Sequence, residues 1–232
     1  MLNSFAQKIN SYNRLLDLQI DMPDVRAMNP FKEDASVLKI ADRFYNKYYS
    51  DKSKRHLVLG INPGRFGAGL TGVPFTDPVR LVDKCGIPYN KPLVTELSSI
   101  FVYEMIDAFG GVVPFYKSFF IHSICPLGLT YLQPNGKEVN YNYYDSKPLL
   151  DTLMPILVTH IQSLINIGGY TDTCFCLGTG KNKAVFERIN EKHQFFKQII
   201  FLEHPRYIMQ YKRKEKEQYI QRYLEAFEKV AQ

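Results

Sequence analysis

The chain has 232 residues, 45% of them hydrophobic and 22% charged, which fits one α/β domain, or two small ones, with a buried core. No apolar run approaches the roughly 18 residues of a membrane span, and the N-terminus lacks the features of a signal peptide, so we expect a cytoplasmic protein with no membrane partner. The net charge is +6, and residues 181–232 hold twelve Lys or Arg against seven Asp or Glu; this basic segment suits nucleic acid, or is a solvated lysine-rich helix.

The first fifty residues are predicted to be mainly helical. Apolar side chains recur at helical spacing from Leu2 to Leu16 and again from Val37 to Tyr48. The segment between them, MPDVRAMNPF (22–31), contains two prolines and is interpreted as a loop.

Four apolar runs of strand length follow, and each is bounded by Pro, Gly or polar residues. They are HLVLGI (56–61), SFFIHSI (118–124), TCFCLG (173–178) and KQIIFLE (197–203). Helical patterns at 92–109, 146–167 and 180–193 separate them, and a C-terminal helix with one apolar face closes the chain. We therefore predict an α/β fold, a three-layer α/β/α sandwich with a central four-stranded, mostly parallel sheet. One domain spanning 1–232 is expected, with 1–50 as a helical extension packed on it.

Ligands of such folds bind beyond the carboxyl ends of the strands. That rule selects four loops, which begin at Asn62, Ser123, Gly178 and His204. Taken alone, an Asn before a Pro is usually a turn former and a His after a strand is usually structural. At the ends of two strands of one sheet, Asn62 and His204 can face a common pocket.

The glycine-rich segment LGINPGRFGAGLTGVPFT (59–76) does not match the common nucleotide-binding loops. Gly60, Gly64, Gly67 and Gly69 do not keep the G-x-G-x-x-G spacing of dinucleotide-binding folds. In LGTGKN (177–182) the leading glycine of a P-loop is missing, and Asn182 stands where Ser or Thr would bind magnesium. There is also no G-x-S-x-G elbow of a serine hydrolase.

The four cysteines show no C-x-x-C spacing, and no second Cys or His pair joins His122 and Cys125. We expect reduced, mostly buried thiols and no metal site. Cys125 as a nucleophile has no supporting partner in the sequence.

Three segments resemble the single-strand-selective monofunctional uracil-DNA glycosylases. GINPGRFGAGLTGVPF (60–75) is similar to that family's G-M-N-P-G-P-F-G followed by T-G-V-P-F, FFIHSICPLG (119–128) to F-V-H-N-x-C-P-L, and LEHPR (202–206) to the start of H-P-S-P-R. The segments keep the family's order, and the resemblance covers about residues 55–210. It implies a uracil-DNA glycosylase-like fold of a divergent bacterial branch, DNA with a damaged base as the partner, and no cofactor or metal. We expect a monomer.

The resemblance also implies site residues. Asn62 takes the place of the residue that positions water, and His204 that of the histidine that stabilises the leaving base. Phe75 matches the aromatic residue that stacks on the extruded base, in line with how such bases are bound generally. Ile61 and Gly64 would shape the pocket, where glycine permits close approach of the backbone.

Two departures from the family motifs affect selectivity and DNA contact. Ser123 stands where the family has the Asn that reads uracil. A hydroxyl is shorter and offers one donor, whereas an Asn amide offers both a donor and an acceptor to the base. We therefore expect the pocket either to read uracil through water or backbone groups, or to accept other deaminated bases such as hypoxanthine or xanthine. After His204 the family's Ser-Pro-Arg is replaced, so Arg206 and Tyr207 would enter the DNA.

Basic residues beyond this loop would meet phosphates, unless YKRKEKE (211–217) is only a charged helix start. They are Lys212, Arg213 and Lys214.

The leading hypothesis is a monofunctional DNA glycosylase of base-excision repair. A binding protein that recognises damaged or single-stranded nucleic acid on the same fold is the alternative, and the presence of both Asn62 and His204 argues against it. A hydrolase of small nucleosides is a third possibility, against which the basic C-terminal segment argues.

Overall fold

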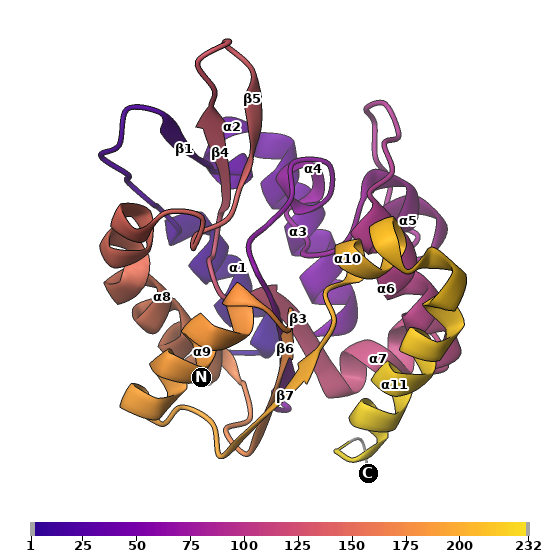
Figure 1. Ribbon diagram of the computed structural model, residues 1–232. Helices are drawn as coiled ribbons and strands as arrows, with labels where there is room; N and C mark the ends of the chain where they lie inside the picture. Colours follow the sequence, from indigo (N-terminus) through magenta and orange to yellow (C-terminus); the bar gives the residue numbers. More distant parts are fainter. Residues whose placement is uncertain (1–2, 231–232) are drawn as a thin grey trace.

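The computed structural model describes residues 3–230, so Leu2 of the first predicted helical run lies outside the described residues (Figure 1). A four-stranded parallel sheet forms the centre, in the order β3–β2–β6–β7. The strands are β2 (His56–Gly60), β3 (Phe119–Ser123), β6 (Thr173–Leu177) and β7 (Gln198–Leu202). Each lies within one residue of its predicted bounds, and the three-layer prediction is confirmed.

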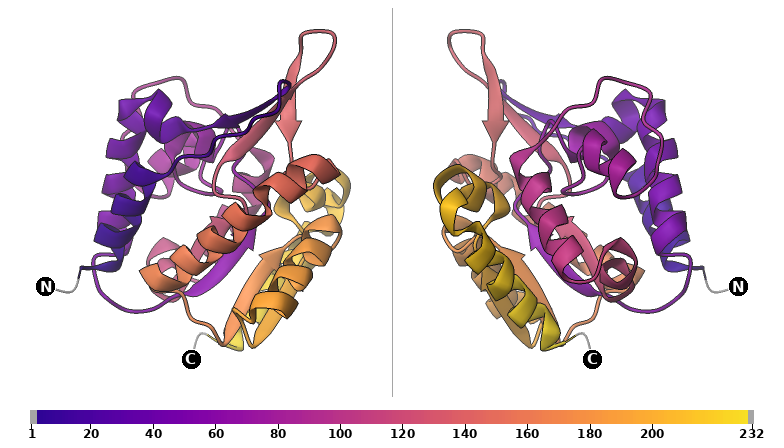
Figure 2. Two further views of the ribbon diagram at one scale, coloured as in Figure 1. Left: turned by 90° about the vertical axis from the view of Figure 1, so that its left-hand side faces the viewer. Right: turned by 90° about the vertical axis from the view of Figure 1, so that its right-hand side faces the viewer.

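Helices cover both faces of this sheet. Neighbouring residues of a strand point to opposite faces, so consecutive phenylalanines of β3 contact different helical layers. Phe119 packs against Phe115 and Phe227, whereas Phe120 packs against Phe5 and Tyr49. The helices on the Phe119 face include α6 (Leu97–Ala108), α7 (Val112–Ser118) and α11 (Lys216–Glu228), and those on the Phe120 face include α1 (Phe5–Leu15) and α3 (Ala35–Tyr48). Figure 2 shows α1 and α3 side by side as one layer. The N-terminal helices thus pack against the sheet and form part of the same hydrophobic core.

Two further helices, α8 (Lys147–Ile167) and α9 (Lys181–His193), lie on the left of the sheet in Figure 1. The prediction that no apolar run is long enough for a membrane span was wrong for α8. Its 21 residues meet that test by length and composition, as does the bent pair α6–α7 taken together. Seven residues of α8 are buried in this fold, including Leu153, Leu157 and Ile161, so packing against the core accounts for its apolar composition.

A second, antiparallel sheet was not predicted. It consists of β1 (Val25–Met28), β4 (Gly128–Leu132) and β5 (Glu138–Tyr141), in the order β1–β4–β5. The interpretation of 22–31 as a loop was therefore wrong for Val25–Met28, which pair with β4. Figure 2 shows the β4–β5 hairpin projecting from the body of the protein.

Short helices occupy the segments that connect the strands. They are α2 (Pro30–Glu33), α4 (Ala68–Thr71), α5 (Pro78–Asp83), α10 (Pro205–Tyr211) and the 3₁₀ turn η1 (Arg213–Glu215). The helix predicted over 92–109 begins only at Leu97, because Asp77 holds the preceding residue in an extended conformation. The buried Asp77 carboxylate accepts hydrogen bonds from the backbone N–H of Glu96 at 2.8 Å and of Arg80 at 2.8 Å.

Candidate active site

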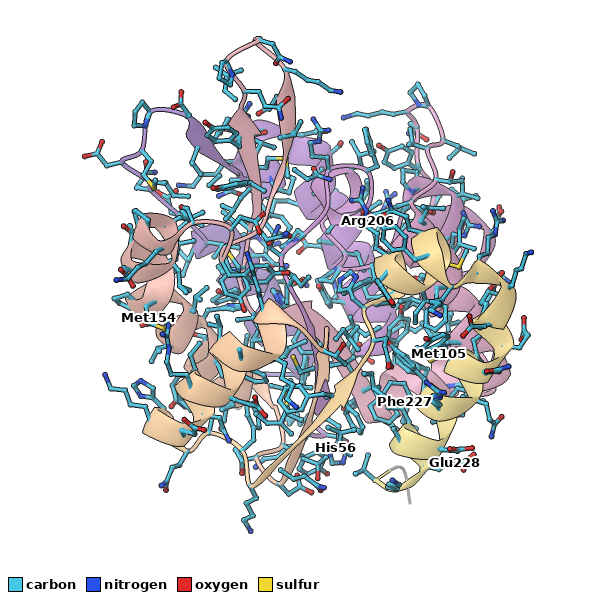
Figure 3. All side chains as sticks on the ribbon, viewed as in Figure 1. His56, Met105, Met154, Arg206, Phe227 and Glu228 are labelled. Carbon is cyan, nitrogen blue, oxygen red and sulfur yellow. The ribbon has the colours of Figure 1, made fainter. Side chains whose placement is uncertain are left out.

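A cavity of about 690 Å³ opens beyond the carboxyl ends of the parallel strands. It collects residues from the segments after β2, β3, β6 and β7, together with residues of β5 and the start of α10. Eight of the predicted site residues line it, namely Ile61, Asn62, Gly64, Phe75, Ser123, His204, Arg206 and Tyr207. Figure 3 labels Arg206 at the start of α10. Lys212, Arg213 and Lys214 do not line this cavity.

The Asn62 amide is oriented by the β4–β5 hairpin. Its Nδ2 donates a hydrogen bond to the backbone carbonyl of Tyr141 at 3.2 Å. Its Oδ1 is buried and has no hydrogen-bond partner among residues 3–230. A buried acceptor without a partner is costly unless a ligand or water satisfies it. The amide is thus held with its acceptor free to receive a hydrogen bond from water.

Phe75 is held in a backbone conformation that is rare for an aromatic residue. Its φ is +54°, in the left-handed region, and non-glycine residues with such strain cluster at functional sites. The ring lies directly over Gly60, where an added Cβ would come within 2.6 Å of the ring atoms. The buried Thr71 hydroxyl stabilises the turn by donating to the carbonyl of Thr76 at 2.7 Å. The Phe75 ring faces His204, with ring centroids 5.7 Å apart.

His204 is held as a neutral imidazole with a defined tautomer. Its Nδ1 accepts a hydrogen bond from the backbone N–H of Arg206 at 3.1 Å, so the ring proton is on Nε2. Burial, with a smaller effect of the Arg206 charge, lowers the pKa of His204 to about 4. At neutral pH the ring therefore offers an Nε2–H donor and carries no charge.

Ser123 lies buried at the end of β3, and two histidines hold its backbone. Its N–H donates to Nδ1 of His122 at 2.9 Å, and its carbonyl accepts from Nε2 of His160 at 3.0 Å. The hydroxyl of Tyr12, on α1, donates to Nδ1 of His160 at 2.5 Å. Burial lowers the pKa of His122 to about 4 and that of His160 well below its usual value. Both rings are therefore neutral, and α1 supports the pocket through them.

Glu96 also lines the cavity, although no sequence motif indicates it. Position 96 lies inside the helix predicted over 92–109, where nothing in the spacing distinguishes it from a surface carboxylate. In the structure its carboxyl oxygens lie against Gly64 and Gly67, where an added Cβ would overlap with them. Burial raises the pKa of Glu96 to about 7; the nearby charge of Arg206 lowers it and that of Asp77 raises it.

Other cavity residues that the motifs did not reveal come from three parts of the chain. They are Asn140, Asn142 and Tyr144 around β5, Lys181 and Asn182 at the start of α9, and Gln210 and Tyr211 at the end of α10. Lys181 and Asn182 follow the Gly178 loop that the strand-end rule selected, whereas the residues around β5 belong to the antiparallel sheet, which was not predicted.

The basic residues after α10 differ in their surroundings. Lys212 forms an ion pair with Glu215 at 3.1 Å, and this hydrogen bond raises the pKa of the lysine. Within residues 3–230, no carboxylate lies within 4.0 Å of the charged groups of Arg213 or Lys214. The 3₁₀ turn thus presents two cations that are not engaged with carboxylates.

The fold and the site together define an enzyme class. The parallel sheet carries at its carboxyl edge an aromatic residue with a strained backbone, a neutral histidine donor and a buried amide acceptor. These groups surround a cavity large enough for a nucleobase. This set stacks a base, stabilises negative charge on it and orients water, as a hydrolytic DNA N-glycosylase requires.

Comparison with known proteins assigns the chain to a superfamily. A family model described as the uracil DNA glycosylase superfamily matches residues 47–228, and the chain belongs to this superfamily. The resemblance inferred from the three motifs is confirmed, as is the expectation of a DNA glycosylase.

Individual relatives agree with this assignment. Single-strand selective monofunctional uracil DNA glycosylases of Bos taurus and Rattus norvegicus are each 30% identical over 114 residues, 42% of this chain. The match spans only 41% and 40% of the length of these two relatives. A crystal structure of wild-type Pedobacter heparinus SMUG2 is 51% identical, with 99% of both chains covered and a TM-score of 0.96.

Proposed function

We propose that the protein hydrolyses the N-glycosidic bond of uracil, or of another deaminated base, in DNA and leaves an abasic site. The observation that carries this proposal is the convergence of Asn62, Phe75 and His204 on one cavity. Each of the three is held in the state that the reaction requires. DNA is the partner, and the protein acts as a monomer in the cytoplasm without a metal or redox cofactor.

The mechanism follows from these three side chains. The extruded base stacks on Phe75, and Nε2–H of His204 donates a hydrogen bond to the base oxygen that gains negative charge. As the bond between the sugar C1′ and the base nitrogen breaks, the bonding pair leaves with the base. Water, oriented by Oδ1 of Asn62, adds to the oxocarbenium-like C1′ and then releases its proton to solvent. An amide is not a base at neutral pH, so the reaction depends on stabilisation of charge.

Alanine variants test the site. Asn62→Ala and His204→Ala are each expected to lower cleavage of a uracil-containing oligonucleotide at least a hundredfold, because each removes an interaction that stabilises the reacting groups. Cleavage is scored as abasic sites opened by alkali, and circular dichroism checks folding. The exposed residues Asn46 and His193 provide matched controls, as Asn46→Ala and His193→Ala. Full activity of both site variants would refute the assignment.

A binding protein without catalysis on the same fold is the second candidate. The free Oδ1 of Asn62 favours catalysis, because a buried amide acceptor without a protein partner can hold the water that hydrolysis needs. A panel of single- and double-stranded oligonucleotides, each with one uracil, hypoxanthine, xanthine or hydroxymethyluracil, separates the two. Binding without abasic-site formation on every member would favour the binding protein.

A further inference from the structure

The Glu96 carboxyl is a polar group on the cavity wall that the mechanism above does not use. Its oxygens lie over the Cα atoms of Gly64 and Gly67. No donor among residues 3–230 forms a hydrogen bond with them, whereas the buried Asp77 carboxylate beneath accepts three. Gly64 belongs to the motif that shapes the base pocket, so the carboxyl occupies the side of the pocket that a larger residue at position 64 would fill.

A neutral carboxyl group offers one donor and one acceptor side by side. Uracil, hypoxanthine and xanthine share an edge on which a ring N–H stands beside a carbonyl oxygen. A carboxylic acid can pair with this edge through two hydrogen bonds, donating to the carbonyl and accepting from the N–H. An ionised carboxylate can only accept, and it repels the carbonyl.

We propose that Glu96 is a specificity-determining residue that contacts the extruded base, with its neutral carboxyl donating to the carbonyl and accepting from the ring N–H of a deaminated base. This inference rests on the proposed glycosylase function. It also explains how a base can be read where Ser123 replaces the family's Asn. The Ser123 hydroxyl has no hydrogen-bond partner within residues 3–230 and can form fewer hydrogen bonds to a base than an amide can. Glu96, at the start of α6, lines the same cavity and would provide the donor–acceptor pair.

The surroundings favour the uncharged carboxyl, and with a pKa of about 7 the group is mostly protonated below pH 7. Burial favours the uncharged form, Asp77 acts in the same direction, and only Arg206 opposes them. The Asp77 charge is itself paired with Arg80 at 3.2 Å. Arg65, between the two glycines, donates to the carbonyl of Glu138 at 3.2 Å. His204 is neutral in this range, so no further cation forms in the cavity as the pH changes.

Two variants of similar size test the proposal: Glu96→Gln keeps a donor and an acceptor but cannot ionise, and Glu96→Leu has neither. Single-turnover cleavage of uracil and hypoxanthine oligonucleotides is measured from pH 5.5 to 8.5. The wild-type rate should fall as pH rises through about 7, by about tenfold per pH unit above the apparent pKa. The Glu96→Gln rate should not show this fall, and at pH 6 it should lie within about threefold of the wild-type rate. Glu96→Leu should lose about tenfold or more at pH 6, as expected for lost hydrogen bonds to the base.

Thermal unfolding provides a second measurement that does not depend on catalysis. A carboxyl whose pKa is raised in the folded state stabilises the fold at low pH and loses that contribution as pH rises through 7. Glu96→Gln should therefore raise the melting temperature at pH 8 more than at pH 5.5. The inference would be overturned if the Glu96→Gln rate still fell as pH rises through about 7, or if the Glu96→Leu rate lay within threefold of wild type at pH 6. Either result would leave the glycosylase assignment intact. A wild-type protein inactive on every oligonucleotide would refute the function itself.

Discussion

At the residue scale, each site side chain is held in one chemical state by a neighbour outside its own motif. The carbonyl of Tyr141 orients the Asn62 amide, and the Arg206 N–H sets the tautomer of His204. Packing on Gly60 fixes the Phe75 ring. Preorganisation of this kind lets polar groups stabilise charge without rearranging during the reaction.

Ser123→Asn is expected to sharpen the preference for uracil over hypoxanthine. The Ser123 backbone is hydrogen-bonded on both sides, so a new amide would enter the cavity from a fixed position and present a donor and an acceptor. We expect the ratio of kcat/KM for uracil to that for hypoxanthine to rise about tenfold. An unchanged ratio in a folded variant would show that residue 123 does not contact the base.

At the element scale, the parts that hold the site are those that the sequence patterns describe least well. The four parallel strands and residues Asn62, Ser123 and His204 could be placed from sequence, because strand ends meet at one edge of a parallel sheet. The β4–β5 hairpin could not, since its short strands are only partly apolar and β4 pairs with β1, a hundred residues earlier. Glu96 was missed because its position depends on Asp77, which no periodicity indicates.

The hairpin also approaches the first motif closely. A Cβ on Gly128 would lie 2.5 Å from the carbonyl oxygen of Pro63, directly after Asn62. From the other side, α1 reaches Ser123 through Tyr12 and His160, two residues 148 positions apart in the sequence. The N-terminal helix is thus a structural support of the pocket, a role that no sequence motif indicates.

Tyr12→Phe tests this support. The change removes the donor to Nδ1 of His160 and leaves a buried acceptor unsatisfied, at a cost of about 1–3 kcal/mol in the free energy of unfolding. We also expect the uracil-to-hypoxanthine ratio of kcat/KM to change severalfold, because the carbonyl end of Ser123 loses its fixed position. Chemical denaturation and the two rates check this. Tyr48→Phe is the matched control, since its hydroxyl makes only a 3.4 Å hydrogen bond to Cys85. A loss of stability with an unchanged ratio would contradict a positioning role.

At the scale of the whole molecule, the basic α10–η1 segment and the projecting segments share one end of the fold. In Figure 1 the β4–β5 hairpin and the loop between α5 and α6 rise from the end that carries the cavity. The α10–η1 segment, with its basic residues, lies beside them. A DNA backbone passing over the cavity would meet this segment, whose basic side chains would replace the cations condensed on the phosphates.

Arg213→Ala and Lys214→Ala are each expected to weaken DNA binding about equally for all base sequences. Each should also lower the slope of log Kobs against log salt concentration by about 1, as for the loss of one phosphate contact. Fluorescence anisotropy between 50 and 300 mM salt measures both effects. Lys192→Ala, at the far end of α9, should leave the slope unchanged. An unchanged slope for the two η1 variants would place the DNA elsewhere.

The burial of all four cysteines affects the conditions under which the protein can work. Burial raises the pKa of Cys85 to about 11 and of Cys125 to about 12, and it raises those of Cys174 and Cys176 further. Only a thiolate reacts readily with oxidants and electrophiles, and at neutral pH these thiols are almost entirely protonated. Cys125, two residues from Ser123, would therefore stay unmodified during the oxidative or nitrosative stress that damages DNA bases, and the pocket would keep its shape when repair is needed most.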